Sequence, residues 1–141
     1  MSDNKFFETG KQALEAQSFS QLIGAELTEF APGKVLLEIP IKDDLLQQHR
    51  FVHGGVISYA ADNALTFVGA SVLGPEVLTS EYKINYVRPA VGEKLVARAS
   101  VIYTGKRQAV CRCDVFTQDS EGEEKMCATA QGTIMSISSS S

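Results

Sequence analysis

The most apolar stretch of the chain reads HGGVISYAADNALTFVGAS, from His53 to Ser71. From Val56 onward, apolar or small residues fall on every face of a helix with about 3.6 residues per turn, which is typical of a helix buried on all sides. We therefore expect residues 56–71 to form a central helix and the rest of the chain to wrap around it.

One carboxylate, Asp62, interrupts this apolar helix. An ionised aspartate in such a place costs roughly several kcal/mol unless it is paired, hydrogen-bonded or open to a cavity. It is either a structural residue that accepts hydrogen bonds from a neighbouring strand or hydroxyl, or a catalytic base or nucleophile. The two glycines at the start of the helix favour the catalytic interpretation.

Gly54 and Gly55 leave backbone N–H groups unshielded at the positive end of the helix dipole, where they suit a developing oxyanion. Asp62 follows Gly54 by eight residues, which is about 12 Å along a helix. One helix therefore cannot bring both groups to one carbonyl. Two copies that run antiparallel across a twofold axis would bring Gly54 of one copy beside Asp62 of the other, so we expect at least a dimer.

Composition favours one globular domain over residues 1–141, because 44% of the residues are hydrophobic and 21% are charged. The net charge of −4 and the pI near 5.2 argue against nucleic acid or an anionic membrane as the main partner. The beginning of the chain does not resemble a signal peptide, and the apolar stretch contains Asp62 and Asn63, so we expect it to be too polar and too short to span a bilayer. These features predict a soluble, cytoplasmic protein.

The three cysteines, Cys111, Cys113 and Cys127, lack zinc-site spacing and are expected to be reduced thiols in the core. A nucleophilic cysteine is a weaker alternative, since no histidine is near in sequence. His49 and His53 have the spacing of two metal ligands on a helical turn, but no nearby carboxylate or thiol completes a zinc set. We expect no metal.

Residues 1–20 predict a helical segment, with an amphipathic helix over 3–17. Two β-rich runs, 23–30 and 34–41, flank Ala31-Pro32-Gly33 and predict a hairpin. After Gly74-Pro75 the pattern predicts a meander of four strands and then a flexible tail over 137–141. The residues expected to share one face in the first three of these strands are Leu78, Ser80, Tyr82, Ile84 and Tyr86, then Leu95, Ala97, Ala99, Val101 and Tyr103, and then Ala109, Cys111, Cys113 and Val115. The expected class is α+β, with an antiparallel sheet curled around the central helix.

Gln47, His53-Gly54-Gly55 and Asp62 at this spacing, followed by Tyr86-Val87-Arg88-Pro89, resemble the hotdog-fold acyl-CoA thioesterases of the PaaI type. The resemblance implies a curled sheet around a long helix and a homodimer that is often doubled to a homotetramer. It also implies hydrolysis of acyl-CoA to a free carboxylic acid and CoA, with no cofactor.

Position by position, the resemblance implies that the Gly54 N–H polarises the thioester carbonyl and that His53 and Gln47 help to position it. Asp62 of the partner subunit attacks the carbonyl or activates water. Thr79 falls where related enzymes often carry a hydroxyl that holds this water. Simple alternation puts Thr79 on the face opposite Leu78, Tyr82 and Ile84, so it reaches the site only through a bulge or from a dimer interface. Ser80 is the competing hydroxyl.

Structural alternatives exist for each of the other candidates. His53 could cap the helix, and Gln47 could be a solvated residue before it. Arg88, Lys106 and Arg107 are the candidate cations for the phosphates of CoA, although loop cations are usually solvated. Phe51, Tyr59 and Phe67 could line an acyl pocket or belong to the core.

Two further functions remain open at this point. A hydratase or dehydratase of hydroxyacyl thioesters would use the same fold, but the chain lacks a second acid or a suitable histidine partner for Asp62. A binding module for acyl thioesters would bind without turnover. The sequence does not determine acyl chain length, aryl or alkyl preference, or CoA against acyl carrier protein.

Overall fold

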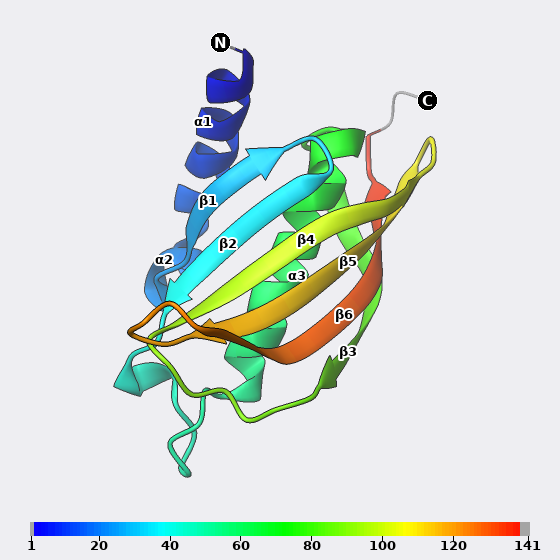
Figure 1. Ribbon diagram of the computed structural model, residues 1–141. Coiled ribbons are helices and arrows are strands. Elements are labelled where there is room, and N and C mark those ends of the chain that lie inside the picture. Colours follow the sequence, from blue (N-terminus) through cyan, green and yellow to red (C-terminus); the bar gives the residue numbers. More distant parts are fainter. Residues whose placement is uncertain (1, 139–141) are drawn as a thin grey trace.

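The computed structural model describes residues 2–138, with side chains from Asn4 onward. Figure 1 shows a sheet that curls around one long helix. The elements in chain order are α1 (Ser2–Glu15), α2 (Ser18–Ile23), β1 (Glu26–Ala31), β2 (Lys34–Pro40), η1 (Asp43–Leu45), α3 (Gly54–Leu73), β3 (Val77–Tyr86), β4 (Lys94–Thr104), β5 (Gln108–Gln118) and β6 (Glu124–Ser136). This arrangement confirms the expected α+β class.

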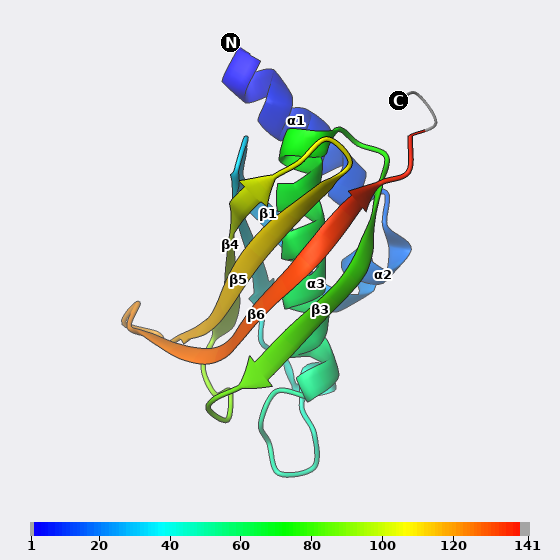
Figure 2. The same ribbon diagram turned by 90° about the vertical axis from the view of Figure 1, so that its right-hand side faces the viewer.

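The six strands form one antiparallel sheet in the order β1-β2-β4-β5-β6-β3. The expected four-strand meander is therefore wrong for its first strand, because β3 pairs with β6 at the far edge and not with β4 (Figure 2). Only β4, β5 and β6 form a true meander. Alternation along a strand identifies its faces but not its neighbour, so the sequence pattern could not show this.

Helix α3 packs one side against the sheet. Its buried residues are Val56, Ile57, Ala60, Ala61, Ala64, Leu65, Phe67, Val68 and Gly69. The opposite side, with Tyr59, Asp62, Asn63 and Thr66, is only partly buried. The expectation of burial on all sides is thus wrong for one chain, since a single curled sheet covers the helix from one direction and leaves a polar stripe less covered.

The helix is also longer than expected. At 20 residues and a mean hydropathy of 1.3 it is long and apolar enough to cross a bilayer, although half of that stretch is buried inside the protein. The expectation that the stretch is too short and too polar is therefore wrong. Its composition reflects its place in the core, where the sheet supplies the apolar surroundings.

Strand β3 contains a bulge. Its register against β6 shifts between Thr79 and Glu81, so Ser80 is the extra residue. The bulge turns Thr79 toward the helix on the same side as Tyr82, while Leu78 is 60% exposed. The single alternating face expected for Leu78, Ser80, Tyr82 and Ile84 is wrong for this reason. A second register shift, between Val101 and Tyr103 of β4, leaves Tyr103 exposed for the same reason.

The N-terminal part differs from expectation at one point. The run expected to begin a strand at residue 23 starts later, because residues up to Ile23 form α2, which ends at Gly24 with a left-handed φ of 88°. At the other end, the Ile137 N–H donates to the Glu76 carbonyl at 2.9 Å, so the predicted flexible tail does not begin at residue 137. Residues 139–141 lie outside the described part of the chain.

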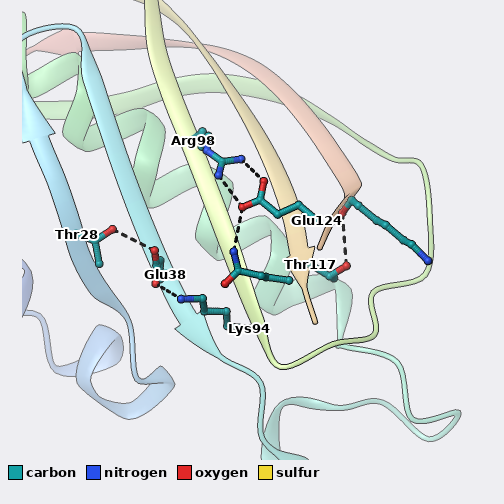
Figure 3. Close-up of polar contacts among 8 residues, drawn as sticks. Thr28, Glu38, Lys94, Arg98, Thr117 and Glu124 are labelled. Carbon is teal, nitrogen blue, oxygen red and sulfur yellow. Dashed lines mark hydrogen bonds and ion pairs between the residues drawn. The ribbon is translucent and has the colours of Figure 1, made fainter. Parts of the chain in front are cut away.

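The face of the sheet turned away from α3 carries cross-strand ion pairs (Figure 3). Arg98 donates two hydrogen bonds to the carboxylate of Glu124, at 2.7 and 2.6 Å. This contact raises the pKa of Arg98 and lowers that of Glu124. Lys94 pairs with Glu38 at 2.8 Å. The outer face is therefore polar, whereas the candidate catalytic groups lie on and around α3.

Candidate active site

The start of α3 presents one open backbone donor. His53 is the N-cap, and its Nδ1 accepts a hydrogen bond from the Gly55 N–H at 2.8 Å. The Val56 N–H donates to the His53 carbonyl at 2.9 Å. Among residues 2–138, no acceptor is found for the Gly54 N–H. The helix dipole favours negative charge at this position, so the open N–H is suited to an oxyanion.

The capping contact determines the tautomer of the neutral His53 ring. Because Nδ1 accepts a hydrogen bond, the ring proton of the neutral imidazole is on Nε2. The cap predicted as a structural alternative is confirmed by this geometry, and Gly55 uses its N–H for it. The exposed Nε2–H is still a donor that a ligand can use.

A cavity of about 410 Å³ lies at the start of α3. Its lining includes Gln47, Phe51, Gly54, Tyr86 and Arg88. The Tyr86 hydroxyl donates to the Gly54 carbonyl at 3.1 Å, which ties the end of β3 to the start of α3. The structure therefore brings together three of the predicted residues, Gln47, Gly54 and Arg88, that are up to 41 positions apart in sequence.

Gln47 has a second role that the sequence did not reveal. Its side-chain oxygen accepts from the His49 N–H, and its backbone N–H donates to the Phe51 carbonyl at 2.8 Å. These bonds close the loop before the helix, in which Arg50 has a left-handed φ of 71°. The carboxamide oxygen of Gln47 thus holds the loop, and its amide N–H groups face no described acceptor.

Asp62 lies further along α3 in a small cluster of hydroxyls. The Thr79 hydroxyl donates to Asp62 Oδ1 at 2.8 Å. Thr79 and Thr66 share a hydroxyl contact of 2.8 Å, and Thr66 also donates to the Asp62 carbonyl at 2.8 Å. The bulge that the sequence analysis required for Thr79 is present, and Ser80, the competing hydroxyl, is exposed on the other side.

Beside Asp62, a polar cluster links α3 to the N-terminal helices. Asn63 Nδ2 donates to Tyr59 OH at 2.9 Å and to Gln17 Oε1 at 3.1 Å. Ser20 Oγ contacts Tyr59 OH and Gln17 Oε1. Burial is the main cause that raises the pKa of Tyr59. Tyr59 is therefore part of a hydrogen-bonded cluster and does not line an apolar pocket. The sequence signal for this cluster was the spacing of Tyr59 and Asn63, two polar residues at i and i+4 in an apolar helix.

The two halves of the candidate site are separate within one chain. The helical rise puts Asp62 about 12 Å from Gly54. Arg88 lies with Gly54, but Lys106 and Arg107 occupy the β4–β5 turn, where the Arg107 carbonyl accepts from the Ser136 N–H. Figure 1 shows this turn at the opposite end of α3 from Gly54. Among residues 2–138, no three His, Cys, Asp or Glu side chains form a metal-binding group.

Comparison with known proteins identifies the family. The family model described as Thioesterase superfamily matches residues 49–124, which contain Gly54, Asp62 and Thr79. The chain belongs to the thioesterase superfamily. It is a thioester hydrolase with the PaaI-type hotdog fold, as the resemblance implied.

Relatives and solved structures agree with this family. Human acyl-coenzyme A thioesterase 13 is 29% identical over 77% of this chain and 79% of its own length. A thioesterase family protein from Silicibacter pomeroyi superposes with a TM-score of 0.88 at 31% identity, over 94% of this chain and 98% of that chain. The PaaI protein of Escherichia coli has the same fold, with a TM-score of 0.83 at 20% identity over 96% of both chains.

Proposed function

We propose that this thioesterase hydrolyses acyl-CoA to a free carboxylic acid and CoA in a site shared by two copies of the chain. The relative named acyl-coenzyme A thioesterase 13 supports the acyl-CoA substrate. The observation that carries the proposal is the open Gly54 N–H at the start of α3, beside the cavity that Gln47 and Arg88 also line. A single preorganised donor of this kind is worth about 10²- to 10³-fold in rate.

In this proposal the Gly54 N–H binds the thioester carbonyl oxygen and stabilises the negative charge that develops on it. The amide of Gln47, which lines the same cavity as Gly54, and the Nε2–H of His53, the residue before Gly54, help to position the carbonyl. Gly55 contributes indirectly, because its N–H holds the His53 ring.

Asp62 of the second copy supplies the base or the nucleophile. As a base, its carboxylate takes a proton from water as the water oxygen attacks the carbonyl carbon, and the C–S bond then breaks to release CoA thiolate. As a nucleophile, the carboxylate attacks the carbonyl carbon, the C–S bond breaks to release CoA thiolate, and water later hydrolyses the mixed anhydride that is left. Thr79, which donates to Oδ1, orients the carboxylate in both routes.

The dimer follows from the separation of the two groups along one helix. A twofold axis across the less covered stripe of α3 would pair the Gly54 end of one helix with Asp62 of the other. Strand β3 lies at the edge of the sheet and has an unpaired side, which supports association at this edge. We include a homotetramer of two such dimers in the proposal.

The same dimer accounts for the charge distribution. Arg88 lies near Gly54, and Lys106 and Arg107 lie at the other end of α3, so antiparallel helices would bring all three cations toward one composite site. They are our candidates for the CoA phosphates. The reaction uses no metal or cofactor, and nucleic acid and membranes are not partners. We propose a cytoplasmic location, which the free buried thiols Cys111, Cys113 and Cys127 support.

The test is complementation between two inactive variants. Gly54→Pro removes the open N–H, and Asp62→Asn removes the carboxylate. Thiol release would first be measured for wild type with short, medium, long and aryl acyl-CoAs, and the best substrate would then be given to each variant and to a 1:1 mixture refolded together. In a shared site, each mixed dimer has one intact site, so random pairing restores about a quarter of the wild-type rate.

A mixture as inactive as its components would show that the site lies within one chain. Full activity of Asp62→Asn would remove Asp62 from the mechanism. A wild-type protein that binds acyl-CoA and never releases thiol would favour the binding module. Conversion of an enoyl-CoA to a hydroxyacyl-CoA, or the reverse, would favour the hydratase or dehydratase. Circular dichroism of each variant verifies that it is folded.

A further inference from the structure

A second cavity, of about 660 Å³, is lined by residues of α1, of the C-terminal half of α3 and of the start of β3. Its volume is within the range of about 300–1,000 Å³ that small-molecule sites occupy. Its lining includes Phe6, Ala13, Phe30, Thr66, Phe67 and Ala70. Of the described residues that line it, Lys5 alone carries a charge.

This cavity adjoins the Asp62 cluster through one shared residue, Thr66. Asp62, Thr66 and Ala70 are four residues apart along α3 and therefore lie on one face of the helix. Thr66 belongs to both features, because its hydroxyl lies 2.8 Å from the Thr79 hydroxyl that donates to Asp62, and it also lines the cavity. The cavity thus begins about one helical turn beyond the carboxylate.

The apolar wall of the cavity is held in place by aromatic contacts. Phe6 of α1 stacks on Phe30 of β1 with ring centroids 4.7 Å apart, and Phe30 meets Phe67 of α3 edge-on at 5.7 Å. A Cβ added to Gly10 would lie 2.4 Å from the Phe30 ring, so this glycine lets α1 approach closely. The three rings connect α1 and β1 to α3 and form a preorganised apolar surface.

We propose that this cavity binds the acyl chain of the substrate, so that α1 sets the acyl length that the enzyme accepts. The inference rests on the proposed function. A thioester carbonyl beside Asp62 would direct its acyl chain past Thr66 and Ala70 into the cavity. One lysine on the lining is a poor match for the phosphates of CoA, which stay outside.

The test is Ala13→Trp, with Gln12→Trp as its matched control. Ala13 is an exposed residue of α1 that lines the cavity, so a large side chain there fills the cavity without replacing a core residue. Gln12 is the preceding residue on the same helix, is exposed and does not line the cavity. We expect Ala13→Trp to lower kcat/KM for dodecanoyl-CoA about tenfold or more and to leave butyryl-CoA within about twofold, because only the longer chain reaches the blocked volume. Gln12→Trp should match wild type on both substrates.

Equal effects of Ala13→Trp on the two substrates, or no effect on either, would overturn the acyl-site inference while leaving the proposed hydrolysis intact. If wild type hydrolyses neither substrate, the proposed function fails, and calorimetric binding of dodecanoyl-CoA still decides the inference. Weaker binding to Ala13→Trp than to Gln12→Trp would support the cavity as the acyl site, and equal binding would overturn it. Should Ala13→Trp fail to fold, Ala13→Leu provides the smaller obstruction.

Discussion

The Thr79 hydroxyl donates a hydrogen bond of 2.8 Å to Asp62 Oδ1, and a bulge at the next residue of β3 turns the Thr79 side chain toward the helix. The bond ties a carboxylate on α3 to the edge strand of the sheet. It holds one oxygen of Asp62 in position and leaves the other without a donor among the hydrogen bonds of residues 2–138.

Loss of the Thr79 hydroxyl should reduce turnover more than stability. Thr79→Val keeps the shape of the side chain and removes the donor, and a hydrogen bond to a charged group is worth about 1.5–3 kcal/mol. We expect kcat to fall about 10- to 100-fold, as measured by thiol release, with a circular dichroism spectrum like that of wild type. Thr79→Ser retains a hydroxyl and should keep most of the activity. A valine variant with the wild-type rate would show that Thr79 does not orient Asp62.

Removal of the Gly54 N–H should abolish most of the activity without unfolding the helix. Proline is tolerated at the first position of a helix, and His53 already has the extended φ of −59° and ψ of 134° that a following proline requires. We expect Gly54→Pro to lower kcat/KM by about 10²- to 10³-fold.

Gly54→Ala is the matched control for that variant. An added Cβ would meet the Tyr86 ring at 3.6 Å, which is ordinary contact, and the N–H is retained. It should keep activity close to that of wild type. Equal loss in the alanine and proline variants would indicate that crowding, and not the missing donor, is responsible.

Gly69 should tolerate substitution poorly. A Cβ at this position would lie 2.5–2.7 Å from the Cβ, Cγ2 and Cγ1 atoms of Ile134, which the backbone of β6 holds in place. We expect Gly69→Ala to lower the free energy of unfolding by about 1–3 kcal/mol, measured by urea denaturation. Gly54→Ala is again the control. A Gly69→Ala protein as stable as wild type would mean that α3 and β6 can move apart without a loss in the free energy of unfolding.

The three cysteines should not react with thiol reagents in the folded protein. Cys111, Cys113 and Cys127 have no exposed surface, and burial raises the pKa of each thiol, to about 11 for Cys111 and for Cys127. We expect no reaction with a coloured disulfide reagent at pH 8 and three equivalents in denaturant, consistent with three free cysteines. Rapid labelling of the native protein would contradict the buried positions.

The same thiols should make the protein less stable in alkali. The folded pKa of about 11 exceeds the ordinary value of 9.0, so the folded state holds these protons more tightly. Their contribution is fully present below pH 9 and is lost as the pH rises through about 11. Urea denaturation at pH 8 and pH 10.5 should show a lower free energy of unfolding at the higher pH. Cys127→Ala should show a smaller decrease, and an identical decrease would assign the effect to other groups.

The sequence predicted the features that depend on local pattern. The apolar run after His53 predicted α3, β-rich runs around a turn predicted β1 and β2, and alternation predicted the later strands. The glycine pair predicted an open donor at the helix start. It could not show that β3 pairs with β6, because strand neighbours are determined by contacts between distant segments. The sequence also could not place the bulge at Ser80, since only the pairing with β6 reveals the extra residue.

For the candidate site too, the sequence predicted individual residues but not the contacts between them. Gly54, Asp62 and Thr79 were predicted as individual residues, and the structure adds the contacts of Asp62 with Thr79 and of Tyr86 with Gly54. The cluster around Asn63 was missed because its partner Gln17 lies 46 residues away. Polar residues in an apolar helix indicate that partners exist but do not identify them.

The order of strands in the sheet also has a consequence for how the molecule is made. Strand β3 leaves the ribosome about 40 residues before β6, its only neighbour in the sheet. Pairing between segments so far apart forms slowly, because a long loop has to close first. Until β6 has been synthesised, β3 lacks the strand that joins it to the rest of the sheet, so the α3 face that β3 covers stays open. We therefore expect the region around Asp62 and Thr79 to be the last to acquire its native contacts during synthesis, and a chain stalled before residue 124 to expose it to chaperones.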